Sequence, residues 1–237
     1  MNNILFNKVS IITVAKVGSA NFLSCNYAQT KNVRHGHSLL ELKRVLNNES
    51  DCMIIVGIRN PIDRNLYYLF QTCWKFNDHF NDVKTKKNNY LGEYCYIPEI
   101  TEESSAEDII NLYFKQKYHN TFNEWFEEFL EITNIIKFDK DKGVDFYNFR
   151  NNNTIMIYTM EKLSENNDYI VEKLGIIDNF KNINDSKDRL YKTVYKEVKQ
   201  KIVYNKEYLN NLLNTKIMKI FYNESVINNF FKKYNIN

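Results

Sequence analysis

The chain has 237 residues, of which 43% are hydrophobic and 26% are charged, and its formal net charge is +3. This balance is typical of a globular protein with a buried core and excludes a disordered or collagen-like chain. The small net charge gives no support for nucleic-acid binding, although it allows a local basic site for a phosphorylated ligand. The length suits one sizeable α/β domain, and we predict a single domain over residues 1–237.

No segment near the N-terminus resembles a membrane anchor, because the apolar run over residues 9–15 is too short to cross a bilayer. The four cysteines are far apart and show no CxxC spacing, which argues against a metal site and against a disulfide framework. We therefore predict a cytoplasmic protein with no transmembrane segment and no metal cofactor.

The first third of the chain alternates short apolar runs with helical patterns. Residues 9–15 are rich in β-branched side chains and predict a buried parallel strand, followed by a helix over residues 20–28 and a short strand over residues 32–35. Ser38 is a good N-cap for the next helix. The apolar positions expected on the buried face of that helix are Leu39, Leu40, Leu42, Val45 and Leu46.

A second buried strand is predicted over residues 52–58. Asn60 and Pro61 follow it as N-cap and first residue of a helix that extends to about Trp74. The repeated order of strand, turn and helix predicts an α/β fold with a parallel sheet and crossover helices.

The rest of the chain is predicted to be largely helical. Residues 76–101 form a long polar and aromatic loop, and Ser104 with Glu107 forms a capping box for a helix that extends to about residue 118. A helix over residues 121–132 is followed by a late strand over residues 154–159, a helix from Glu161 to Gly175, and helical, basic sequence from residue 185. Four aromatic residues share one face of the helix over 121–132 and are expected to be core: Phe122, Trp125, Phe126 and Phe129.

The turn Lys16-Val17-Gly18-Ser19 between the first strand and the first helix is typical of an anion-binding loop. Backbone N–H groups at a helix start point outward, and Gly18 lets the backbone approach an anion closely. Lys16 adds a positive charge and Ser19 a hydroxyl donor. The loop lacks the GxxxxGK[ST] spacing of nucleotide kinases and ATPases, and a plain tight turn is the alternative interpretation.

A second anion site is predicted where Arg59 follows the strand over residues 52–58. Ligands of open parallel sheets bind beyond the carboxyl ends of the strands, and a guanidinium can bind a phosphate through two hydrogen bonds. Arg64 lies just inside the next helix. The alternative to a ligand-binding role for Arg64 is an ion pair with a surface carboxylate.

These two segments resemble the sulfotransferase superfamily, and most closely its carbohydrate and polysaccharide branch. That branch has a first loop that reads lysine-x-glycine-serine or threonine, and a second site that reads arginine-x-proline-x-x-arginine. The resemblance covers residues 9–22 and 54–70. Looser similarity to a bacterial group of capsular polysaccharide synthesis proteins extends over Trp125-Phe126, residues 138–143 and residues 160–163.

The resemblance implies a P-loop-like parallel sheet flanked by helices. It also implies that the protein binds 3′-phosphoadenosine 5′-phosphosulfate as the sulfuryl donor. Arg59 would hold the 3′-phosphate. The family usually places a serine eight residues after that arginine, and Tyr67 takes this donor-binding position here, with its hydroxyl in place of the serine hydroxyl. Ala20 replaces a usual hydroxyl residue. The residues implied to hold the 5′-phosphosulfate are Lys16, Gly18, Ser19, Ala20 and Asn21.

Sulfuryl transfer needs a cation at the leaving oxygen and a base at the acceptor hydroxyl. Lys16 suits the first role, and His37 is the candidate for the second because it follows the short strand over residues 32–35. His35 and Glu41 are the alternative bases, and a purely local packing role for His37 also stays open. A predicted basic helix near the C-terminus has two interpretations: its cations contact the 3′-phosphate, or they form a solvated face. These cations are Lys187, Arg189 and Lys192.

The function expected from the sequence is therefore transfer of a sulfuryl group to a hydroxyl of a glycan or small metabolite, in polysaccharide biosynthesis. The alternative is a catalytically silent protein that binds a nucleotide or glycan on the same fold. The expected partners are the donor and a glycan or small-molecule acceptor, with no nucleic acid. Neither the acceptor nor the oligomeric state can be predicted from the sequence.

Overall fold

The computed structural model describes residues 6–14, 17–73, 104–115, 121–178 and 192–234. Five strands form one sheet in the order β2-β1-β3-β5-β4, in which every neighbouring pair is parallel except β4 with β5. The predicted α/β class with a mostly parallel sheet is confirmed. The strands are β1 (Lys8–Ile12), β2 (Val33–Gly36), β3 (Cys52–Ile58), β4 (Val144–Asn148) and β5 (Thr154–Thr159).

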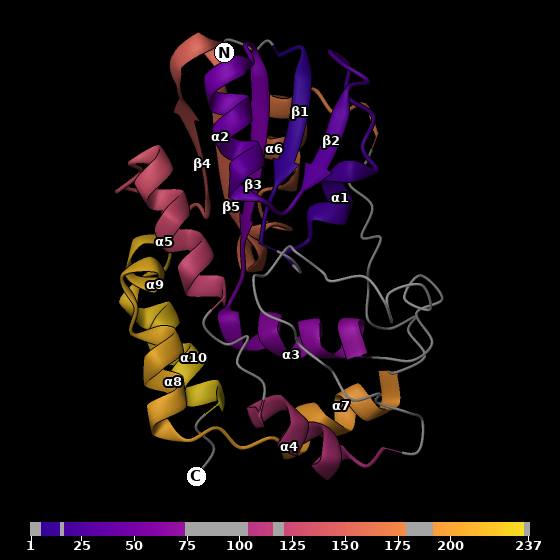
Figure 1. Ribbon diagram of the computed structural model, residues 1–237, viewed down its shortest axis with the longest axis vertical. Helices are drawn as coiled ribbons and strands as arrows, with labels where there is room; N and C mark the ends of the chain where they lie inside the picture. Colours follow the sequence, from indigo (N-terminus) through magenta and orange to yellow (C-terminus); the bar gives the residue numbers. More distant parts are fainter. Residues whose placement is uncertain (1–5, 15–16, 74–103, 116–120, 179–191, 235–237) are drawn as a thin grey trace.

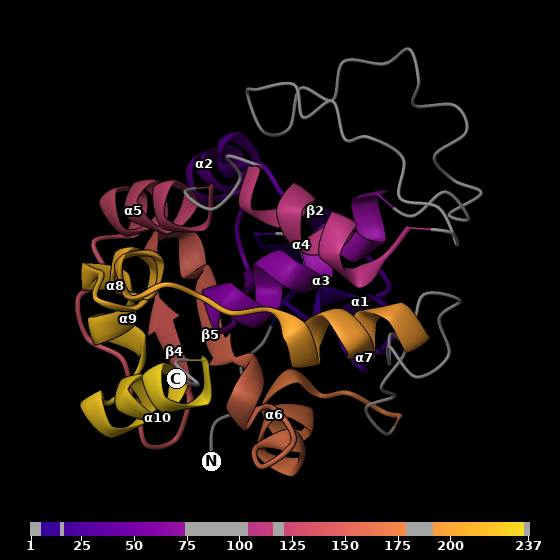
Figure 2. The same ribbon diagram turned by 90° about the horizontal axis from the view of Figure 1, so that it is seen from below.

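Helices cover both faces of the sheet and its carboxyl edge. In Figure 1, α2 lies in front of the sheet and α6 behind it, while α3, α4 and α7 lie below the ends of the strands. The view from below shows α4 and α7 on either side of α3 (Figure 2). The bounds are α1 (Ser19–Leu23), α2 (Leu39–Asn48), α3 (Pro61–Cys73), α4 (Ala106–Lys115), α5 (Thr121–Thr133), α6 (Asn167–Leu174), α7 (Lys192–Lys201), α8 (Lys206–Leu213), α9 (Lys216–Phe221) and α10 (Glu224–Tyr234), with short 3₁₀ turns at Arg150–Asn152 and Met160–Lys162.

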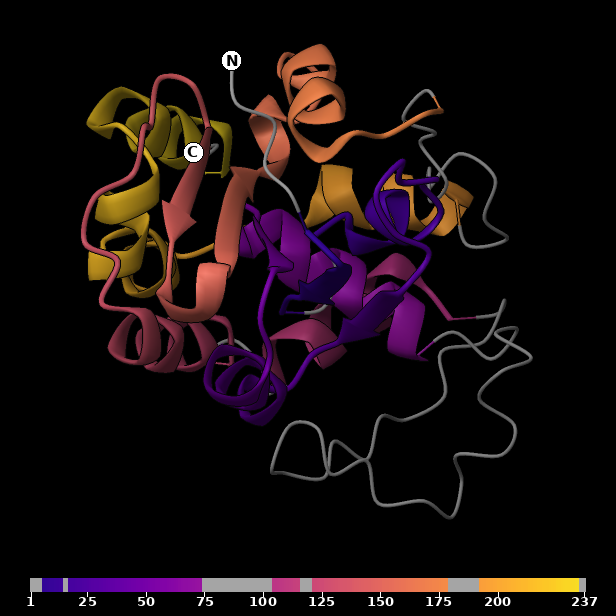
Figure 3. The ribbon, with the colours of Figure 1, turned by 90° about the horizontal axis from the view of Figure 1, so that it is seen from above.

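The sheet separates two hydrophobic cores. All seven residues of β3 are buried, and successive side chains point to opposite faces. Ile54 and Val56 belong to the larger core with α2, α3, α5 and the C-terminal helices, whereas Met53 and Ile55 belong to the smaller core beneath α6. Seen from above, α2 and α6 lie on opposite sides of the strands (Figure 3). A strand buried on both faces therefore has no polar alternation in its sequence.

Several predicted helix ends are confirmed by their capping contacts. The Ser38 hydroxyl accepts a hydrogen bond from the Leu40 amide at 3.2 Å, and the Asn60 side chain accepts one from the Ile62 amide at 2.9 Å. Gly175 ends α6 in the left-handed conformation, with φ of +58°. Leu40 was expected on the buried face of α2 but is 75% exposed, because the buried stripe runs through Leu39, Leu42, Val45 and Leu46.

The end of α1 and the start of α4 differ from the prediction. The helix expected over residues 20–28 ends at Leu23, since the next residues bond to the segment after α6. Tyr27 forms an antiparallel bridge with Ile176, and the Ala28 amide donates to the Gly175 carbonyl at 2.8 Å. The capping box of α4 lies one residue later than expected, at Ser105 and Asp108 (each side chain accepting from the other backbone amide at 3.1 Å).

Strand β4 was not predicted, and α6 begins at Asn167 rather than near Glu161. β4 is one of the two edge strands of the sheet, and of its five residues only Val144 is fully buried. It returns to β5 through a tight turn in which Asn151 and Asn152 have φ of +59° and +56°. Asparagine tolerates this left-handed region better than most residues, which allows the short connection.

Asp63 joins the C-terminal helices to α3. Its carboxylate, 15% exposed, pairs with Lys199 of α7 at 3.2 Å and with Lys233 of α10 at 2.9 Å. Burial alone would raise the pKa of Asp63, but the two lysine charges outweigh burial and lower the pKa to about 2. The ionised carboxylate is therefore favoured in the folded protein.

Acid should weaken the fold through Asp63. Its folded-state pKa is depressed, so its contribution is complete above about pH 4 and is lost as pH falls through about 2. The full contribution is about 2 kcal/mol of unfolding free energy. We expect Asp63→Asn to be less stable than wild type in urea unfolding at neutral pH, with the difference shrinking toward pH 2. Asp168→Asn, at an exposed position of α6, is the control. A deficit in Asp63→Asn that does not change with pH would contradict this linkage.

Candidate functional site

The topology places a switch point between β1 and β3. The chain leaves β1 toward β2 on one side and then returns to β3 on the other side of β1. In open parallel sheets, ligands bind beyond the carboxyl ends of the strands at such a point. The loop after β1, which contains Gly18, and the loop after β3, which contains Arg59, both lie at this edge above α3 (Figure 1).

Contacts with β5 and with the 3₁₀ turn that follows it set the shape of the first loop. The buried Tyr158 hydroxyl donates to the Val17 carbonyl at 2.7 Å. Gly18 has φ of +79°, and a Cβ atom on it would lie 2.5 Å from the Met160 sulfur. The sequence suggested that this glycine serves close approach to an anion. The structure gives two further reasons for a glycine at this position. The backbone is left-handed there, and a side chain would collide with Met160.

The three predicted donor-binding residues after Gly18 lie in the first part of the five-residue helix α1. Ser19 and Asn21 are buried, at 8% and 4% exposure, and Ala20 is half-buried. The Asn21 amide donates to the Gly18 carbonyl at 3.1 Å, which closes the turn. Lys16, predicted to meet the leaving oxygen, lies outside the described residues.

Two histidines lie next to this loop. His35 Nε2 is 3.0 Å from the Ser19 hydroxyl oxygen, and the His35 and His37 rings meet edge to face at 4.7 Å. His37 Nδ1 lies 2.7 Å from the Thr13 carbonyl oxygen. A carbonyl only accepts, so Nδ1 carries the proton and Nε2 is the basic nitrogen of the neutral ring. This assigns the tautomer of His37.

Helix α5 holds the backbone at His37. The Trp125 indole N–H donates to the His37 carbonyl at 2.9 Å, although the two residues are 88 positions apart. Trp125 is half-buried, while Phe122, Phe126 and Phe129 are fully buried, as expected of a core stripe. One side chain of this stripe therefore also supports the candidate base.

Glu41, an alternative base, lies against the backbone of Gly36. A Cβ atom on Gly36 would overlap the Glu41 carboxylate, and the same carboxylate is 3.8 Å from Arg44. Glu41 therefore packs at the start of α2, beside the histidine pair. His79 and His119, which had no supporting context in the sequence, lie outside the described residues.

Arg59 lies over an aromatic ring of α3, and that ring in turn contacts a ring of α7. Its guanidinium is 5.4 Å from the centroid of the Tyr67 ring, and Tyr67 meets Tyr195 edge to face at 6.2 Å. Burial raises the pKa of Tyr195 to about 12, an effect that the Arg59 charge partly opposes. Tyr67 is 8% exposed. It thus supports the Arg59 guanidinium by a cation–π contact, which a serine at that position could not provide.

Glu161 is a site residue that the sequence analysis missed. Its two carboxylate oxygens accept hydrogen bonds from the Asn60 amide and the Tyr222 hydroxyl, both at 2.8 Å. The residue as a whole is exposed, but loss of water around the carboxylate raises its pKa, which these hydrogen bonds and Arg59 partly oppose. Glu161 follows a buried strand, which is the signal that identified Arg59.

The structure describes two of the other predicted cations, Arg64 and Lys192. Arg64 is fully buried rather than on the surface, donates to the Asn65 side chain at 2.8 Å and lies over the Tyr68 ring at 5.0 Å. Lys192 is an exposed residue at the start of α7. Lys187 and Arg189 lie outside the described residues, as does the expected loop over residues 76–101.

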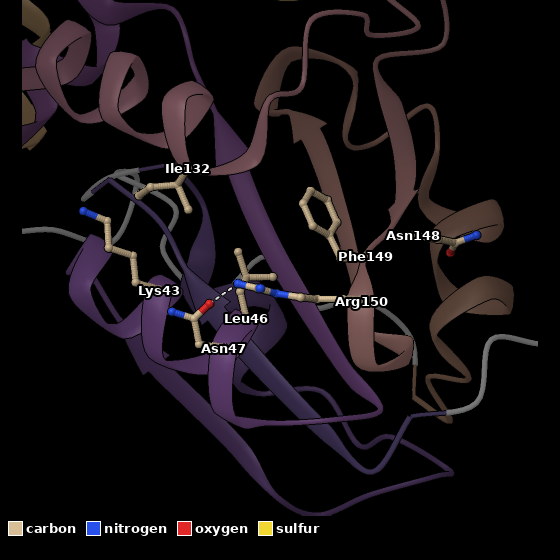
Figure 4. A pocket seen from close by; sticks show the side chains of 7 residues that line it. All are labelled: Lys43, Leu46, Asn47, Ile132, Asn148, Phe149 and Arg150. Carbon is tan, nitrogen blue, oxygen red and sulfur yellow. Dashed lines mark hydrogen bonds between the residues drawn. The ribbon is translucent and has the colours of Figure 1, made fainter.

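An open hollow of about 590 Å³ lies at the opposite edge of the sheet, where α2 ends and β4 meets the next turn (Figure 4). Its cations already have partners, because Lys43 pairs with Glu128 at 2.9 Å and Arg150 donates to Asn47. We therefore assign the candidate site to the carboxyl edge. The hollow is lined by Lys43, Leu46, Asn47, Ile132, Asn148, Phe149 and Arg150.

Among the described residues, no group of three or more His, Cys, Asp or Glu side chains is placed to hold a metal ion. No helix in the described part of the chain is both long and apolar enough to cross a membrane.

The chain is an α/β protein with Ser19, His37 and Arg59 at one edge of a mostly parallel sheet. No family model matches this chain, and no curated protein matches its sequence.

Proposed function

We propose that this protein is a sulfotransferase that moves a sulfuryl group from 3′-phosphoadenosine 5′-phosphosulfate to a hydroxyl of a glycan or small metabolite. The observation that carries the proposal is the position of the two predicted anion-binding segments. They follow β1 and β3, which are neighbouring strands on either side of the switch point. The segments resembling the family's two donor-binding motifs thus lie at the same edge of the sheet.

The residues at this edge suit the reaction. In the proposal, the loop from Gly18 to Asn21 holds the phosphosulfate and Arg59 holds the 3′-phosphate. Nε2 of His37 takes the proton of the acceptor hydroxyl while the oxygen of that hydroxyl forms a bond to the sulfur of the donor. The bond from sulfur to the bridging oxygen breaks, and its electrons remain on adenosine 3′,5′-bisphosphate. Lys16, assigned from the sequence alone, stabilises that oxygen. The cytoplasmic location and the acceptor class stay predictions.

A silent nucleotide- or glycan-binding protein is the second candidate. The observation favouring it is that Arg59 already has a partner in Tyr67, while Ala20 offers no hydroxyl to a donor. Both candidates bind the nucleotide, so turnover distinguishes them. A donor-dependent sulfation assay across a panel of glycans and small alcohols gives product for the enzyme and none for the silent protein.

We expect adenosine 3′,5′-bisphosphate to raise the melting temperature of the wild-type protein. A ligand at about 100 times its Kd stabilises a protein by about 2.7 kcal/mol if it binds only the folded state. Differential scanning calorimetry over a range of ligand concentrations measures the shift. No shift at millimolar ligand, in protein that is shown to be folded, would overturn the donor assignment.

Arg59→Ala provides the internal comparison for this experiment. It should weaken binding of the bisphosphate by about 1.5–3 kcal/mol, the value of a charge-assisted contact, and should affect adenosine 5′-phosphosulfate less because that ligand lacks the 3′-phosphate. Arg150→Ala is a matched control, since Arg150 bonds to Asn47 at the opposite edge of the sheet. Equal losses for both ligands in Arg59→Ala would mean that Arg59 does not bind the 3′-phosphate.

A further inference from the structure

A hydrogen bond joins the loop after β1 to the exposed end of β2. His35 Nε2 lies 3.0 Å from Ser19 Oγ, and α1 packs against β2 at this point (Figure 1). Ser19 is the first residue of α1 and is 8% exposed, whereas His35 is exposed to solvent. A titratable ring in contact with water is therefore bonded directly to a hydroxyl of the proposed donor site.

The direction of this bond determines what Ser19 can offer a ligand. A serine hydroxyl has a single proton. If that proton is donated to a bare Nε2, the oxygen of Ser19 presents only lone pairs, which repel an anion. If Nε2–H donates instead, the serine proton can point to an anion, and the two hydrogen bonds strengthen each other. An imidazolium ring permits only the second arrangement.

We propose that His35 is a positioning residue that directs the Ser19 hydroxyl toward the anionic donor, so that protonation of His35 tightens donor binding. The inference rests on the proposed function, because it takes the loop from Gly18 to Asn21 as the phosphosulfate site. It separates the two histidines: His37 removes the acceptor proton, while His35 acts through Ser19. Donor affinity then falls as pH rises through the titration of His35.

Other ionisable groups face His35 and must be separated from it. The His37 ring is the nearest, at 4.7 Å, and the Glu41 carboxylate packs against Gly36, the next residue of β2. On β1, the residue paired with His35 is the apolar Ile11. Helix α1 has no ionisable side chain. Lys16 precedes the loop but lies outside the described residues, and a lysine normally keeps its charge over the pH range concerned.

The test is calorimetric titration of adenosine 5′-phosphosulfate from about pH 5.5 to about pH 8.5. The sulfate and the anhydride phosphate of this ligand stay ionised throughout, so changes in affinity come from the protein. We expect wild-type affinity to fall about tenfold across the range. His35→Gln keeps an N–H donor of similar reach without a titrating ring, and its affinity should not depend on pH. Because His35 is exposed, this replacement leaves the core intact.

Three further variants locate the effect. Ser19→Ala should bind more weakly and lose the pH dependence, whereas His37→Gln and Glu41→Gln should keep it. A pH profile that survives in His35→Gln or Ser19→Ala would overturn the role of His35 while leaving the proposed function standing. A wild-type affinity that is measurable but constant with pH would do the same. Absence of binding in the folded wild-type protein would overturn both proposals.

Discussion

Replacing His37 with alanine is expected to lower the turnover of sulfuryl transfer by about 10²–10⁴-fold, the usual contribution of a general base. The Nδ1 bond to the Thr13 carbonyl at 2.7 Å orients the ring and leaves Nε2 as the basic atom. The Trp125 bond to the His37 carbonyl fixes the backbone at the same place. Binding of adenosine 3′,5′-bisphosphate should change little, because the base acts on the acceptor. Steady-state kinetics and calorimetry measure the two effects separately.

Lys16→Ala is the contrasting variant for His37→Ala. A lysine that meets the donor in both the ground state and the transition state should lower turnover and weaken donor binding together. Full activity in His37→Ala would assign the base to another residue. Glu41 would then be tested first, because it lies beside the histidine pair against Gly36.

Phe126→Ala is expected to reduce the free energy of unfolding by about 3–5 kcal/mol. Phe126 is fully buried on α5 and lies 4.8 Å from the Phe122 ring and 5.9 Å from the Phe221 ring of α9. Removing its ring opens a cavity between two helices that are far apart in the sequence. Urea unfolding at neutral pH, with a fit of the midpoint and slope, measures the change.

Leu40→Ala is the matched control for Phe126→Ala, since Leu40 is also a large apolar residue on a helix but is 75% exposed. Its effect should be within about 0.5 kcal/mol. Similar costs for the two variants would show that the aromatic face of α5 is not core. The aromatic face of α5 would then be available as a binding surface. The burial of its phenylalanines argues against that interpretation.

Local sequence determined the elements whose signals lie within a few neighbouring residues. Strands β3 and β5 begin and end where the sequence predicted, because a strand buried on both faces is a continuous apolar run. Asn60 with Pro61 and the left-handed Gly175 mark helix ends through bonds to their own helices. The order of these elements was sufficient to predict a parallel sheet and to place Gly18 and Arg59 after two of its strands.

Only the tertiary structure decided features that depend on distant partners. Helix α1 stops at Leu23 because the chain beyond it bonds to the segment after α6, and β4 exists because β5 offers it a ladder of hydrogen bonds. Glu161 reaches Asn60 across 101 positions. The contact of His35 with Ser19 could not be predicted from the sequence either, because it depends on the parallel pairing of β2 with β1, which brings these two residues together. Such contacts arise from packing, which a local pattern of residues does not encode.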